Sequence, residues 1–205
     1  MRYALPAFGL AILMGGNAYA AQGADPSWPC IQRKVPELSM GQIWNGPDLT
    51  PAAANWQADK DVSELVTELA ARRVPIADAQ TEIRGLPQKL GPDKLDERLK
   101  MLVQGLFDHM NHERSQVISG IGRYAQKQRD LAAELRKEAS QLGELQAKPG
   151  ADQQQVGAMV DRLNWETRVF EERVQSLTYV CEVPTIIEQR LYALAKTIGE
   201  VLPKE

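Results

Sequence analysis

The sequence has few of the residues with which most enzymes and metal proteins work. Its 205 residues include only two histidines and two cysteines, and the cysteines do not form a Cys-x-x-Cys motif. It also lacks a nucleophile elbow, a recognisable catalytic triad and a phosphate-binding loop. A thiol oxidoreductase is therefore unsupported, and an enzyme of any kind is a poor expectation.

The chain has no excess of positive charge and no long apolar run beyond its first twenty residues. It carries 27 acidic against 24 basic side chains, for a net charge of -3. Nucleic-acid binding requires a basic field, so a nucleic-acid partner is excluded. A membrane-spanning helix needs about 20 consecutive apolar residues, so no transmembrane segment is expected in the remaining chain.

Residues 1–20 have the pattern of a secretory signal peptide. Arg2 supplies a positive start, residues 4–14 form a short apolar segment, and Ala18-Tyr19-Ala20 matches an A-x-A cleavage site. We expect cleavage near Ala20 and export of residues 21–205, as one domain, to the periplasm or the exterior.

Cys30 and Cys181 are the only cysteines of the chain. Disulfides persist in oxidising compartments, so in an exported protein this pair predicts one disulfide bond. The alternative is two buried free thiols.

The fold class predicted is all-α, built on a long antiparallel, coiled-coil-like helical hairpin. Its outgoing arm, residues 93–147, has no proline after Pro92 and is rich in good helix formers. Residues 148–151 form the turn, and the return arm, residues 152–201, begins behind the N-cap Asp152. The proline in Val183-Pro184 predicts a break within that arm.

Apolar residues on the return arm alternate at intervals of four and three, the seam of a coiled coil. The seam residues are Val156, Val160, Leu163, Thr167, Phe170, Val174, Leu177 and Cys181. Toward the turn, we expect one apolar stripe with one side uncovered, available for self-association or a protein partner. The stripe consists of Leu131, Leu135, Leu142, Leu145, Val156, Val160 and Leu163.

Residues 21–57 differ in composition from the helical domain expected over residues 58–205. They hold five prolines and three of the four tryptophans, which predicts an irregular arm packed at the base of the hairpin. A groove for a sugar or peptide is the alternative. Short helices are expected at residues 59–73 and from Asp78 to Arg84, the second closed by Gly85 and Pro87.

Three small residues, Ser115, Ser119 and Gly122, are spaced by four and three on the outgoing arm. They predict a smooth strip that lets another backbone approach closely. Because the strip is level with Cys181, we expect it to receive the N-terminal arm. A groove for an outside peptide is the rival interpretation.

Both histidines lie in one helical turn. His109, His112 and Glu113 could ligate one metal ion, the only cofactor that the sequence leaves open. The alternative is that Glu113 or His109 pairs with Arg190 across the hairpin while His112 faces water. The function expected is an exported, non-enzymatic helical scaffold or chaperone-like interaction protein of the periplasm. A periplasmic metal-binding sensor or buffer is the alternative.

Overall fold

The computed structural model describes residues 25, 27–90 and 94–203, and every secondary-structure element in these ranges is a helix. The predicted signal peptide and Asp93 lie outside the described residues. The elements are α1 (Met40–Ile43), the 3-10 helix η1 (Pro51–Ala58), α2 (Lys60–Ala70), α3 (Ile76–Leu90), α4 (Leu95–Gln146) and α5 (Gln153–Val201).

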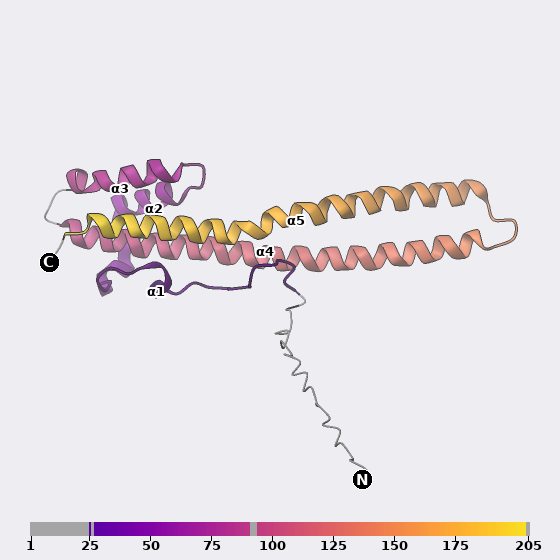
Figure 1. Cartoon of the computed structure of the whole chain (residues 1–205), viewed down its shortest axis with the longest axis horizontal. Coiled ribbons are helices and arrows are strands. Elements are labelled where there is room, and N and C mark those ends of the chain that lie inside the picture. Colours follow the sequence, from indigo (N-terminus) through magenta and orange to yellow (C-terminus); the bar gives the residue numbers. More distant parts are fainter. Residues whose placement is uncertain (1–24, 26, 91–93, 204–205) are drawn as a thin grey trace, which may run out of the picture.

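The two long helices, α4 and α5, run antiparallel along most of the molecule (Figure 1). The chain reverses between them at residues 147–152, where Gly150 has a φ of 79°. Asp152 caps α5 by accepting a hydrogen bond of 2.9 Å from the backbone N–H of Gln154. The predicted all-α fold with a helical hairpin is confirmed.

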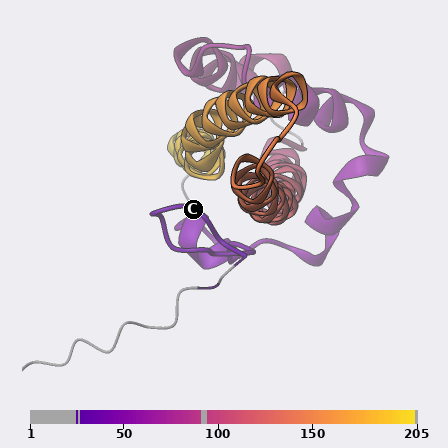
Figure 2. The same ribbon diagram turned by 90° about the vertical axis from the view of Figure 1, so that its right-hand side faces the viewer.

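The short helices and the N-terminal arm lie at one end of this hairpin, which we call the base (Figure 1), and they surround the two long helices there (Figure 2). One apolar core is formed there between α4, α5, α2, α3 and the arm. Burial of a large aliphatic side chain contributes about 1.5–3 kcal/mol. The largest fully buried side chains are Leu69, Ile83, Leu86, Leu99, Leu102, Leu106, Met110, Ile121, Ile187, Leu191, Leu194 and Ile198.

The tryptophans of the arm have partners for their indole N–H groups. Trp28 donates to the carbonyl of Gln32 at 2.6 Å, and Trp44 donates to that of Pro47 at 2.8 Å. Trp56 reaches α4, where it donates to a carboxylate oxygen of Asp108 at 3.0 Å. Since Trp44 and Trp56 are also buried, the proline-rich arm packs at the base.

Buried Arg190 ties α5 to the end of α2. Its guanidinium donates two hydrogen bonds to the Leu69 carbonyl, at 3.0 and 2.7 Å, and one to the Val74 carbonyl at 2.8 Å. Burial lowers the pKa of Arg190. The predicted pairing with Glu113 or His109 is wrong, because Arg190 bonds to the carbonyls of Leu69 and Val74 and Glu113 pairs with Arg72 at 2.9 Å.

Two prolines lie inside helices that were predicted to end near them. Helix α5 continues through Pro184, and α3 continues through Pro87 to Leu90. Proline removes one backbone hydrogen bond from a helix. Pro184 is buried, and Leu86 beside Pro87 is buried as well, so packing against the core favours the helix over a break.

Gly105 allows a close approach between α4 and the N-terminal elements. A Cβ atom there would lie 2.6 Å from Val66 Cγ2 and 2.9 Å from Trp56 Cδ2. Helix α4 is also continuous through Gly120 and Gly122. The glycine at 105 therefore serves packing and does not break the helix.

Replacing Gly105 with alanine should lower the free energy of unfolding by about 1–3 kcal/mol, because the added methyl overpacks the core. The matched change Gly143→Ala should raise it by up to about 1 kcal/mol, since alanine is the better helix former and its Cβ would meet nothing within 4 Å. Urea denaturation of both variants measures the two effects. Equal effects at the two sites would show that residue 105 is not tightly packed.

Candidate functional site

The base and the far half of the hairpin differ sharply in burial. On α4 the last buried residue toward the turn is Gln128, and on α5 it is Cys181. Residues 129–180 are all described, and none of them is buried. We call this segment the two-helix extension. On α5, residues 153–180 span about 40 Å at the helical rise of 1.5 Å per residue.

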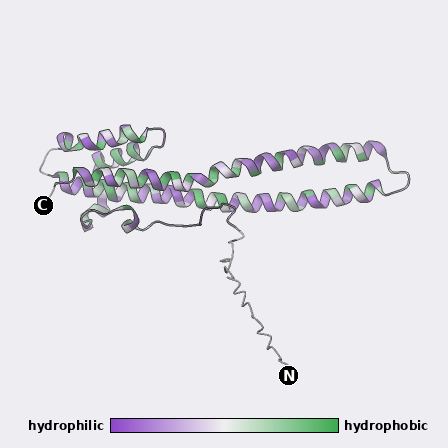
Figure 3. Cartoon of the chain, viewed as in Figure 1, coloured by the Kyte–Doolittle hydropathy of each residue, from purple (hydrophilic) through white to green (hydrophobic). Residues whose placement is uncertain are grey.

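The predicted apolar stripe lies within this extension. All seven of its residues are half-buried: each is partly covered by the opposite helix and partly open to solvent. Hydrophobic and hydrophilic residues alternate along both arms of the extension (Figure 3). The stripe is therefore neither a closed core nor a fully exposed surface.

A network of charged side chains joins the two arms near the stripe. Arg162 of α5 lies 2.6 Å from Glu138 of α4 and 2.9 Å from Glu166, one turn along α5. The hydrogen bond that Arg162 donates to Glu166 and the charge of Glu138 raise the pKa of Arg162, and the same hydrogen bond lowers the pKa of Glu166. The Glu138–Arg162 bridge helps to fix the register of the arms, although exposed ion pairs stabilise little.

A second apolar line lies on the back of α5. Trp165 is 64 % exposed, Tyr179 76 % and Ile186 48 %. Their intervals of 14 and 7 residues place them on one side of the helix. Trp165 lies midway between the seam residues Leu163 and Thr167, so that side points away from α4.

The N-terminal arm is fixed to the hairpin where the extension begins. Cys30 and Cys181 form the predicted disulfide, with their Cα atoms 5.5 Å apart. Buried Arg114 of α4 donates to the Val35 carbonyl at 2.6 Å and lies 3.4 Å from a Glu188 oxygen on α5. Its burial lowers its pKa. The N-terminal arm, α4 and α5 are thus joined to one another where the extension begins.

The arm passes over the strip of small residues on α4. The Ser115 hydroxyl donates to the Pro36 carbonyl at 3.0 Å, and a Cβ atom on Gly122 would lie 3.7 Å from the Ser27 carbonyl oxygen. Ser119 lines a cavity of about 590 Å³ that remains between arm and helix. The arm is therefore close to both ends of the strip and leaves space at its middle.

His109, His112 and Glu113 line one cavity of about 350 Å³ beside Trp56. The Glu113 carboxylate is paired with Arg72. A His112 ring nitrogen lies 2.8 Å from the Gln116 side-chain amide. Within the part of the chain that the structure describes, no group of three or more histidine, cysteine, aspartate or glutamate side chains could hold a metal ion.

The sequence pattern did not predict the roles of two residues, one at the boundary of the extension and one within it. Gln128 is a buried polar residue of the α4 seam, where it follows Ile121 and Ala125 at intervals of four and three. Trp165 is the one tryptophan outside the N-terminal arm. Counting heptads on α5 places it off the seam, which is an unusual position for so large an apolar side chain.

No helix of the described chain is both long enough and apolar enough to cross a membrane. Comparisons with protein-family models, with curated proteins and with solved structures found no match.

Removing the disulfide through Cys30→Ser and Cys181→Ser should lower the free energy of unfolding by about 2–5 kcal/mol. The bond closes a loop with a sequence separation of 151. Amide exchange should increase mainly in residues 27–34, because hydrogen bonds to α4 still hold residues 35–38. Unchanged stability and unchanged exchange in that segment would show that the bond does not hold the arm.

Zinc should bind this protein no more tightly than it binds the double variant His109→Ala, His112→Ala, because the Glu113 carboxylate is already paired with Arg72. Isothermal titration of both proteins at neutral pH measures the difference. Tight, saturable binding that the double variant loses would instead support the metal-binding alternative.

Proposed function

We propose that this protein is an exported, non-enzymatic helical scaffold or chaperone-like interaction protein of the periplasm. Its two-helix extension binds a protein partner or a second copy of the chain. The base acts as the folded anchor, since its core lies between several layers of helix and arm. The extension presents the apolar stripe at a distance from that anchor.

The observation that carries this proposal is the absence of any buried residue over 129–180. Two helices shield only the strips that face each other, so the flanks of the seam stay open to solvent. Long two-helix segments often gain stability by packing into four-helix arrangements. The half-buried stripe is the surface on which a further helix would pack.

Exposed Trp165 and Tyr179 give the extension a second feature common to protein interfaces. Aromatic residues are enriched at interfaces because they bury large areas with few rotatable bonds. Their place on the back of α5 means that a partner can contact the extension without opening the hairpin.

Export is supported by the signal-like pattern of residues 1–20 and by the Cys30–Cys181 bond. Structural disulfides are rare in reducing compartments and common in oxidising ones. The non-enzymatic part of the proposal rests on the lack of catalytic motifs in the sequence.

The variant Leu135→Asp should lower the oligomeric state or weaken partner capture, because a charge on the stripe opposes apolar packing. The base should stay folded, since residue 135 lies outside its core. Ala133→Asp is the matched control, because it adds the same charge at an exposed position of the same arm. Multi-angle light scattering over a range of concentrations measures the change.

A native protein that stays monomeric at high concentration, and is unaffected by Leu135→Asp, would overturn the self-association form of this proposal. The partner form is tested by adding the protein to a thermally unfolding test protein and following turbidity. Suppression of aggregation that Leu135→Asp loses and Ala133→Asp retains would support it. Equal behaviour of all three proteins would contradict it.

A further inference from the structure

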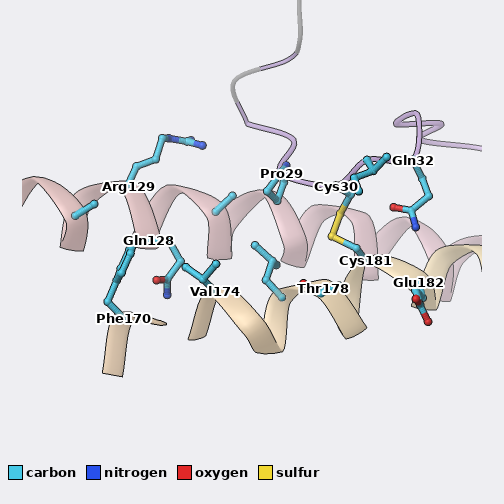
Figure 4. A pocket seen from close by; sticks show the side chains of 14 residues that line it. Pro29, Cys30, Gln32, Gln128, Arg129, Phe170, Val174, Thr178, Cys181 and Glu182 are labelled. Atoms are coloured by element: carbon cyan, nitrogen blue, oxygen red, sulfur yellow. A yellow bond between two sulfur atoms is a disulfide. The ribbon is translucent and has the colours of Figure 1, made fainter. Parts of the chain in front are cut away.

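A cavity of about 600 Å³ lies where the N-terminal arm meets the extension. Its walls come from three segments: Pro29 to Gln32 of the arm, α4 near Ala125, and α5 near Val174 (Figure 4). The disulfide forms part of the wall. Cavities of about 300–1,000 Å³ are the size that holds small-molecule ligands.

The walls of this cavity are mainly apolar. Phe170, Val174 and Leu177 line it from α5, and Ala125 and Ala132 line it from α4. Val174 is also among the exposed large apolar residues of the chain, as is Ile31 on the arm. A bound apolar body would therefore cover side chains that are otherwise in contact with water.

One buried side-chain oxygen in the lining, Oε1 of Gln128, accepts no hydrogen bond. Gln128 is only 7 % exposed. Its carboxamide extends from α4 toward α5 between Phe170 and Val174 (Figure 4). An unsatisfied buried acceptor is unfavourable by about 1–3 kcal/mol, so a donor supplied to this oxygen would be favoured.

Charged residues lie only at the two ends of the cavity. Arg129 is at one end and Glu182 is at the other, with the apolar walls and Gln128 between them (Figure 4). Transfer of an unpaired charge into apolar surroundings is strongly unfavourable. The centre of the cavity therefore suits an uncharged ligand.

We propose that this cavity binds a small, uncharged, largely apolar molecule that carries one N–H or O–H donor. The apolar body packs on Phe170, Val174 and Leu177, and the donor bonds to Gln128 Oε1. The last torsion of a glutamine side chain is broad, so a small rotation turns this oxygen toward the ligand. This site is separate from the stripe, and its test does not depend on self-association.

The first experiment compares two fluorescent probes. N-phenyl-1-naphthylamine is uncharged and apolar and has one N–H donor, while its N-methyl derivative lacks the donor. The native, disulfide-bonded protein should bind the first probe saturably, one per chain, and prefer it about fivefold to tenfold, the fold-change expected for one hydrogen bond. Gln128→Leu should abolish the preference while still binding both probes.

A second pair of variants tests whether the probe binds in the cavity. Ala132→Phe should weaken binding of both probes at least tenfold, because Ala132 lines the cavity and the ring would fill it. Ala133→Phe adds the same ring at the next, exposed position and should leave binding unchanged. Thermal unfolding followed by circular dichroism confirms that each variant keeps its fold.

Absence of saturable binding to the native protein would overturn the proposal. Equal effects of Ala132→Phe and Ala133→Phe would also overturn it, because the probe would then lie elsewhere. Persistence of the donor preference in Gln128→Leu would remove the role of Gln128 and, with it, the proposed ligand chemistry.

Discussion

Two helices that pack side by side can bury only the strips that face each other, and this limit governs the whole molecule. At the base, α2, α3, η1 and the arm add further layers, so that many side chains of α4 and α5 are fully buried. Beyond Gln128 on α4 and Cys181 on α5 the described segments add no such layer, and no residue of the extension is buried. The same pair of helices thus forms a core at one end and an accessible surface at the other.

The N-terminal arm lies at the boundary between the packed base and the accessible extension. Trp44 and Trp56 of the arm pack on the base, Arg114 donates a hydrogen bond to the arm's backbone at Val35, and the disulfide joins the arm to Cys181. In the part of the chain that the structure describes, the arm covers the hairpin only up to this level, and the apolar cavity and the unsatisfied Oε1 atom of Gln128 lie where that cover ends. The proposed protein-binding stripe begins on the far side of the same boundary.

The sequence alone determined the helical hairpin, its turn and the pairing of its cysteines. Period and composition are local properties: the 4-3 seam of α5, the absence of proline over residues 94–147 and the cap at Asp152 act within a few residues of each other. The cysteine pair was predictable because only one pairing exists. The packed arm followed from tryptophans that are rarely left in water.

Only the tertiary structure decided the features that depend on neighbours distant in sequence. Pro184 and Pro87 remain helical because their surroundings are buried. Arg190 bonds to the carbonyls of residues 69 and 74, which lie far from it in sequence, so no local pattern predicts these bonds. The cavity beside Gln128 needs three separate segments to form its walls. Local conformational preferences determine where helices and turns form. Burial and hydrogen bonding depend instead on which segments pack together in space, and local sequence patterns do not specify that packing.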